Sequence, residues 1–68
     1  MTTGDRIRTA RKARKLTQAQ LGQLLQPPQT RQAIHDLEKG RYEPSANTLR
    51  GLCSALGVSC DWLLGVTA

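Results

Sequence analysis

Aromatic residues are almost absent from this 68-residue chain, which contains one Trp, one Tyr and no Phe. Trp62 and Tyr42 alone cannot build the stacking platform that holds single-stranded nucleic acid. No apolar run approaches the roughly 20 residues of a membrane-spanning helix, and residues 1–15 lack the apolar segment of a secretory signal. We therefore expect a cytoplasmic protein with no membrane partner.

Groups that carry catalytic or metal chemistry are also scarce. The two cysteines, Cys53 and Cys60, lie seven residues apart without a CxxC motif, and His35 is the one histidine. Zinc would lack ligands, so we expect no metal site and predict that Cys53 is a core thiol. No motif places a nucleophile beside His35, the carboxylates are not paired, and a glycine-rich phosphate loop is missing. The sequence argues against an enzyme and predicts no cofactor and no small-molecule ligand.

Acidic residues are half as numerous as basic ones, five against ten, which gives a formal net charge of +5. All of this excess lies in residues 1–15, where six basic residues accompany Asp5, and the rest of the chain is neutral overall. Basic side chains that neutralise phosphates release counterions, so this segment suits a polyanionic partner. A solvated helix face explains the same composition equally well, because many small domains are basic for solubility.

The first half of the chain is typical of two short helices. The first is predicted over residues 4–15, and Thr17 opens the second through a capping box with Gln20. The segment 26–29, which contains two prolines, must end the second helix after Leu25, because a proline ring clashes with the preceding helical turn.

Three further helices are predicted from their capping residues. Thr30 is the preferred cap of a helix over residues 31–38. A second possibility begins this helix at Pro28, since proline is favoured at the first helical position, and would place Gln29 on the helix. The last two helices follow serine caps, at Ser45 and Ser59.

No alternating strand pattern is present, so the chain is predicted to be a compact all-α domain of five helices over residues 1–68, with its core in 4–65. Apolar residues at helical spacing are predicted to face this core. They are Ile7, Ala10, Ala13, Leu16, Leu21, Leu24, Leu25, Ala33, Ile34, Leu37, Leu49, Leu52, Cys53 and Leu56.

Four segments occur in a familiar order. They are LTQAQLG at 16–22, IHDLEKG at 34–40, Pro-Ser at 44–45 and LGVSCDWLL at 56–64. Together they resemble the Cro and cI repressor type of helix-turn-helix domain, also described as lambda-repressor-like or XRE-like. The resemblance implies a phage or prophage transcription regulator that binds a pseudo-palindromic double-stranded DNA operator as a homodimer. One departure is the turn at 26–29, which is longer than the tight turn usual in that family.

The resemblance also places the start of the third helix in the major groove, with Thr30, Arg31 and Gln32 at base edges. Arg can bond guanine with a bidentate fork, Gln can pair with adenine, and the Thr methyl group can pack on thymine. An ordinary polar helix face is the alternative. Asp36, one turn further, would accept from cytosine, act against wrong sequences, or form a surface salt bridge.

Phosphate contacts are expected around the same helix. The exposed amides that open the second helix suit a phosphate, with Thr17 and Gln18 beside them, although capping alone also explains Thr17. The resemblance pairs Arg11 with Glu38 near the DNA backbone, which would orient Arg11 toward a phosphate. The other expected phosphate contacts are His35, whose alternative is simple solvent exposure, Lys39 and Arg41.

The last helix is expected to form the dimer interface, because that is its usual role in domains of this kind. The residues assigned to it are Cys60, Trp62 and Leu63. A reducing cytosol argues against an intermolecular disulfide at Cys60. Two other functions remain as alternatives, the antitoxin of a toxin-antitoxin pair and a restriction-modification controller protein. The short chain favours a Cro-like protein, a controller or an excised DNA-binding domain.

Overall fold

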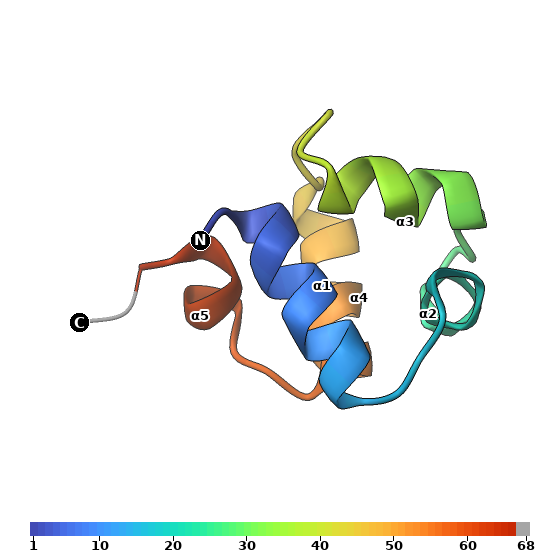
Figure 1. Cartoon of the computed structure of the whole chain (residues 1–68), viewed down its shortest axis with the longest axis horizontal. Coiled ribbons are helices and arrows are strands. Elements are labelled where there is room, and N and C mark those ends of the chain that lie inside the picture. Colours follow the sequence, from blue (N-terminus) through green and yellow to red (C-terminus); the bar gives the residue numbers. More distant parts are fainter. Residues whose placement is uncertain (67–68) are drawn as a thin grey trace.

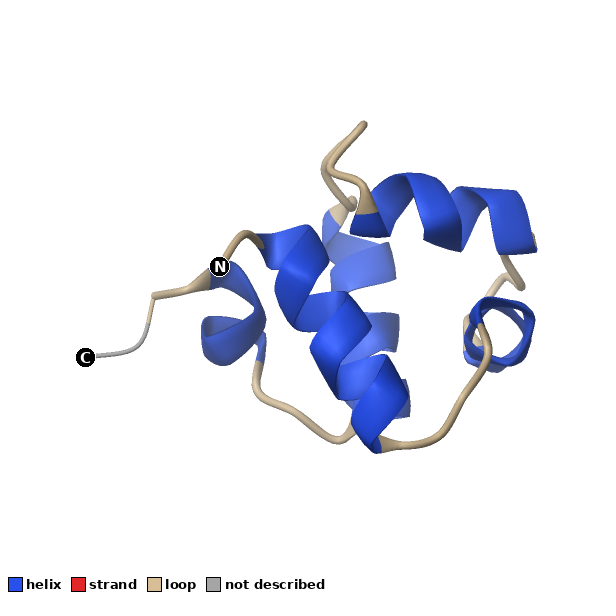
Figure 2. Ribbon diagram, in the orientation of Figure 1, coloured by secondary structure: helices blue, strands red, loops and turns tan. Residues whose placement is uncertain are grey.

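In the computed structural model, which describes residues 1–66, the chain forms five helices and, within those residues, no strand. The helices are α1 (Thr3–Ala13), α2 (Gln18–Leu24), α3 (Arg31–Glu38), α4 (Ala46–Leu56) and α5 (Cys60–Leu64). Helix α1 packs against α3, α4 and α5, while α2 packs against α3 and α4. Figure 1 shows α2 and α5 on opposite sides of α1, with α3 crossing above, and the all-helical pattern is plain in Figure 2. No helix in the described part of the chain is long and apolar enough to span a bilayer.

Every helix begins behind a Ser or Thr whose side-chain oxygen accepts a hydrogen bond from a backbone N–H three residues further on. Such a bond satisfies one of the orphan amide donors of the first turn. The caps predicted at the second to fifth helices are confirmed, and the sequence pattern missed the first. The five caps are Thr2, Thr17, Thr30, Ser45 and Ser59.

Helix α1 is shifted from its predicted bounds of 4–15. It begins at Thr3, because Thr2 and Asp5 form a capping box, and it ends at Ala13. Lys15 has a positive φ of 58°, and the Leu16 amide donates to the Arg11 carbonyl, which closes the helix end two residues earlier than expected.

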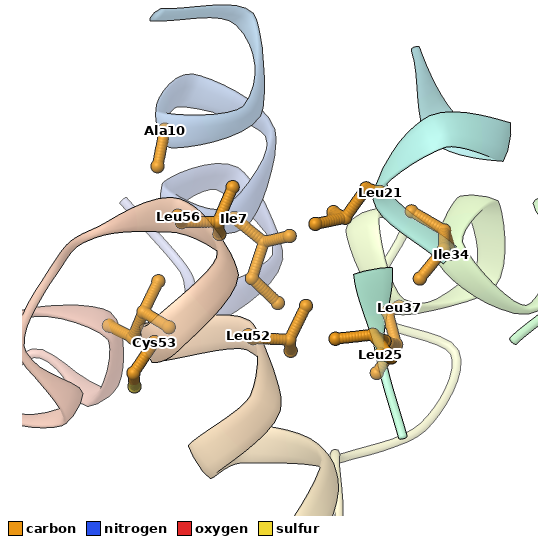
Figure 3. Packing of buried hydrophobic residues seen from close by; sticks show 10 residues of the cluster. Ile7, Ala10, Leu21, Leu25, Ile34, Leu37, Leu52, Cys53 and Leu56 are labelled. Carbon is orange, nitrogen blue, oxygen red and sulfur yellow. The ribbon is translucent and has the colours of Figure 1, made fainter. Parts of the chain in front are cut away.

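The core is built by apolar residues from all five helices and by Leu25, the C-cap of α2 (Figure 3). Its buried members are Ile7, Ala10, Leu21, Leu25, Ile34, Leu37, Leu52, Cys53, Leu56 and Leu63. Leu16 and Leu49 are partly buried against it.

Two residues predicted to face the core are exposed instead, Ala13 and Leu24. A three-residue step falls short of the 3.6-residue helical turn, so a run of such steps from Ile7 through Ala10 drifts off the buried face by Ala13. Arg11, four residues after Ile7, takes the buried position in its place. Leu24 leaves the core because Leu25, the extended C-cap of α2, fills it.

The longer turn between α2 and α3 is tied back onto α2 at Gly22. The Gly22 carbonyl accepts from the amides of Leu25, at 3.3 Å, and Gln29, at 2.9 Å. A Cβ atom at Gly22 would collide with the Gln29 carbonyl oxygen, so any larger residue would push the turn away from the helix. This close approach holds the start of α3 against α2 despite the two prolines.

Cys53 on α4 and Cys60 on α5 are joined by a disulfide, with Cα atoms 5.7 Å apart. The prediction of a core thiol at Cys53 is therefore wrong in its chemistry, although the residue is buried as expected. The turn after α4, with Gly57 at a positive φ of 67°, folds α5 back onto α4 and brings together two cysteines seven residues apart. The Cys60 sulfur is bonded within its own chain, so it is not free for a bond to a second copy.

Candidate nucleic-acid interface

The start of α3 forms an exposed polar surface. Thr30 is its N-cap, and its side chain accepts from the Ala33 amide at 3.1 Å. The preferred start of this helix is thus confirmed, and the alternative start at Pro28, which would have put Gln29 on α3, is wrong. The side chains of Thr30, Arg31 and Gln32 are all exposed, as a base-reading surface requires.

One turn further along α3, Asp36 joins two of the predicted DNA-contacting residues. Its Oδ1 atom accepts from the Gln32 Nε2 atom at 3.0 Å and from the Arg41 Nη1 atom at 2.7 Å. The salt bridge between Asp36 and Arg41, one of the alternatives raised for Asp36, is confirmed. The hydrogen bond from Arg41 is the main reason that the pKa of Asp36 is lowered, with a smaller contribution from Gln32. Asp36 is therefore ionised at neutral pH.

The end of α3 holds a second carboxylate, Glu38, which is buried. Arg11 Nε donates to Glu38 Oε2 at 2.6 Å, Arg11 Nη2 donates to Oε1 at 3.1 Å, and their side chains are 11% and 3% exposed. Gln18 Nε2 also donates to Glu38 Oε1, at 3.2 Å, and Arg11 Nη1 donates to the Leu16 carbonyl at 2.8 Å. The expected pairing of Arg11 with Glu38 is confirmed, and it ties α1, α2 and α3 together.

This network uses side chains that were predicted to contact phosphates. Arg11 is 9% exposed, and its guanidinium donates to three acceptors inside the protein. The Gln18 side-chain amide donates to Glu38, while Thr17 and Gln20 form the expected capping box of α2. A phosphate contact by Arg11, Thr17 or Gln18 remains a prediction.

A basic hollow of about 280 Å³ opens where α1, the start of α2 and the end of α3 meet. Glu38 pairs with Arg11, so the net positive charge of the lining comes from Arg8, Lys12 and Lys39. Arg8 and Lys12 were not among the predicted contacts, although they lie four residues apart and hence on one face of the first helix. The residues that line the hollow are Arg8, Arg11, Lys12, Gln18, His35, Glu38 and Lys39.

Helix α5 lies on the other side of α1 from α2 (Figure 1), where the dimer interface was expected. Leu63 has no exposed surface, so it belongs to the core and cannot touch a second copy; its assignment to the interface is wrong. The sequence pattern does not separate Leu63 from Leu64, because adjacent leucines on so short a helix are equally apolar. Trp62 is partly buried, whereas Leu64 is 45% exposed and Val66 is 67% exposed.

These features define a class of protein. Two consecutive helices, α2 and α3, pack against each other across a turn, and α3 has an exposed polar start and borders a basic hollow at its other end. A family model described as helix-turn-helix matches residues 7–63, and the chain belongs to this family. The family and the five-helix fold predicted from the sequence are confirmed.

Two repressor proteins are similar to this chain. The immunity repressor protein of Bacillus phage phi105 is 42% identical over 65 residues, which cover 96% of this chain and 44% of that protein. The chain thus spans less than half the length of this curated relative. The crystal structure of the P22 c2 repressor protein in complex with the synthetic operator 9T, in the presence of Tl⁺, superposes with a TM-score of 0.87. It is 38% identical to this chain, and the match covers 94% of both.

Proposed function

We propose that this protein is a DNA-binding transcription regulator of the phage-repressor kind, which binds a specific double-stranded operator through α3. The observation that carries the proposal is the polar start of α3, where Thr30, Arg31 and Gln32 are all exposed. Arg can read guanine and Gln can read adenine through bidentate hydrogen bonds in the major groove. The similar P22 c2 repressor, described in complex with a synthetic operator, supports the proposal.

Phosphate contacts would fix the position of α3 on the duplex. The cations of the hollow, Arg8, Lys12 and Lys39, lie beside the end of α3 and suit the sugar-phosphate backbone. His35 lines the same hollow, and Arg41 is the exposed cation that follows the helix. In this proposal the main role of the buried Arg11 is to fix the position of α3 relative to α1 through Glu38.

A homodimer would place two copies of α3 on successive turns of the duplex. Half-sites read by paired recognition helices lie about 34 to 36 Å apart, one helical turn of DNA. The exposed apolar side chains of Leu64 and Val66, together with the partly buried Trp62, are the surface that we propose for contact between the copies. The site of action is the cytoplasm, where the operator DNA lies.

The similar proteins are repressors, which favours this proposal over an antitoxin or a restriction-modification controller. The test is selection of bound sequences from random duplex DNA by the full chain. The proposal expects enrichment of an inverted repeat whose halves are centred about one helical turn apart. Enrichment of no sequence, or of a protein partner instead of DNA in a copurification, would contradict it.

A further inference from the structure

Gln32 and Asp36 lie four residues apart on α3, so their side chains occupy the same face of the helix. Their contact has a fixed direction. An ionised carboxylate only accepts hydrogen bonds, so the Gln32 amide nitrogen, and not its oxygen, must face Asp36. The 3.0 Å contact therefore selects one of the two orientations of the carboxamide.

Asp36 is itself held in place from the far end of α3. Gly40 has a positive φ of 75°, and the amides of Gly40 and Arg41 donate to the carbonyls of Leu37 and Asp36, which forms a Schellman motif. This motif turns the chain back over the helix, so the Arg41 guanidinium reaches the carboxylate of Asp36 at 2.7 Å. The order of dependence runs from the Gly40 turn to Arg41, from Arg41 to Asp36, and from Asp36 to Gln32.

The fixed orientation leaves Gln32 with a defined set of free groups. The amide nitrogen carries two hydrogens, one of which is directed to Asp36. The second hydrogen and the Oε1 atom remain, and this donor and acceptor pair matches N7 and N6 of adenine in the major groove. Asp36 is less suited to read a base itself, because its Oδ1 atom already accepts from two side chains.

We propose that Asp36 is a positioning residue that presents the Gln32 carboxamide to an adenine of the operator, with Arg41 holding Asp36 in turn. The proposal rests on the proposed function, because a duplex must be read before a reading group can be positioned. Asp36 then acts on base recognition through Gln32, instead of accepting a hydrogen bond from cytosine itself. The recognised chemistry is one adenine per half-site, at the base pair that faces Gln32.

Two measurements test this proposal on the full chain. In the first, the sequences selected by the wild type are compared with those selected by Gln32→Ala, Asp36→Ala and the double variant. We expect Gln32→Ala to reduce the preference for adenine at one base pair per half-site about 5- to 150-fold, the range that a bidentate contact supplies. Asp36→Ala is expected to reduce preference at the same base pair at least about fivefold, and the double variant to lose no more than Gln32→Ala alone.

The second measurement is made without DNA. The ¹⁵N–¹H resonances of the Gln32 side-chain amide are expected to shift in Asp36→Ala, because the hydrogen bond to Oδ1 is lost. Glu43→Ala is the matched control, since Glu43 is an exposed carboxylate in the loop after α3. It removes an equal charge and is expected to leave both the Gln32 resonances and the adenine preference unchanged.

These measurements separate the positioning role of Asp36 from direct base reading by Asp36 and from failure of the proposed function. Full adenine preference in Asp36→Ala, or unshifted Gln32 resonances, would overturn the positioning role. Relaxed preference at a different base pair, with effects that add in the double variant, would instead make Asp36 a base-reading residue. A wild type that enriches no sequence would overturn the proposed function itself, and the positioning role with it.

Discussion

Two carboxylates on α3 each accept hydrogen bonds from one arginine and one glutamine, but in opposite surroundings. Glu38 accepts from Arg11 and Gln18 in the interior, whereas Asp36 accepts from Arg41 and Gln32 at the surface. The Arg11–Glu38–Gln18 triad joins three helices, and its two donors lie 27 and 20 residues away from Glu38 in the sequence. The Asp36 triad is local, because all of its members lie between residues 32 and 41.

One arrangement of groups can thus serve the fold or the site, depending on its burial. The side chains of Arg11 and Glu38 are 11% and 3% exposed, and breaking such a buried pair leaves an uncompensated charge. The side chains of Arg41 and Asp36 are 61% and 26% exposed. Water can therefore solvate either charge when its partner is removed, and loss of this pair should change the free energy of unfolding little. The buried triad should therefore govern stability, and the exposed triad should govern recognition.

Loss of the buried carboxylate should destabilise the protein more than any other change proposed below. Glu38→Ala should lower the free energy of unfolding by about 3 to 5 kcal/mol, because Arg11 stays buried without its partner. Chemical denaturation followed by circular dichroism measures the change, with Glu43→Ala as the exposed control. A loss below about 1 kcal/mol, no larger than that of a surface pair, would remove the contrast between the two triads.

Arg31→Ala should affect binding rather than stability, since the side chain is exposed at the start of α3. We expect a loss of about 1 to 3 kcal/mol in binding to the selected operator, with relaxed preference at one base pair per half-site. Fluorescence anisotropy with operator and scrambled duplexes measures both quantities. An equal loss on the two duplexes would show that Arg31 contacts only the backbone.

Arg41 belongs to the exposed triad and is also a proposed phosphate contact. Arg41→Ala should weaken binding to all sequences and reduce the slope of log K against log salt by about one. Anisotropy titrations at several salt concentrations give this slope. If the slope did not change, Arg41 would serve only to hold Asp36, and the phosphate contact would be ruled out.

The smallest expected effect is the pH dependence of the exposed triad. The hydrogen bond from Arg41 lowers the pKa of Asp36 below its ordinary value of 3.8. A carboxylate whose folded pKa is depressed contributes stability fully above the unfolded pKa and loses it as the pH falls through the folded pKa. The difference in melting temperature between wild type and Asp36→Asn should thus be constant near neutral pH and shrink below pH 3.8. If the difference in melting temperature instead grew as the pH fell, the pKa of Asp36 would not be lowered in the folded protein.

Local chemistry made most of the fold predictable. Four of the five caps follow from a single Ser or Thr before an apolar helical stretch, and the proline turn ends α2 as expected. Thr2 was missed because its capping box uses Asp5 where the usual sequence pattern has Glu or Gln. The burial of Arg11 in place of Ala13 was missed because the helical pattern was read from apolar residues alone, and a buried arginine is not part of such a pattern.

The site was predictable only in its outline. The residues at the start of α3 and the Arg11–Glu38 pair followed from the family resemblance, and the structure places them as expected. The Gln32–Asp36 contact, the Cys53–Cys60 disulfide and the full burial of Leu63 depend on how side chains and helices meet in space. Sequence spacing alone does not give those distances.

The most direct test of base reading by α3 is dimethyl sulfate footprinting of the full chain on its selected operator, which reports access to guanine N7 in the major groove. Two protected patches on one face of the duplex, centred about 10 base pairs apart, are the predicted result. Their protection should disappear at one guanine per half-site in Arg31→Ala. Guanine N7 atoms that stay fully reactive in the bound operator would contradict major-groove reading by this helix.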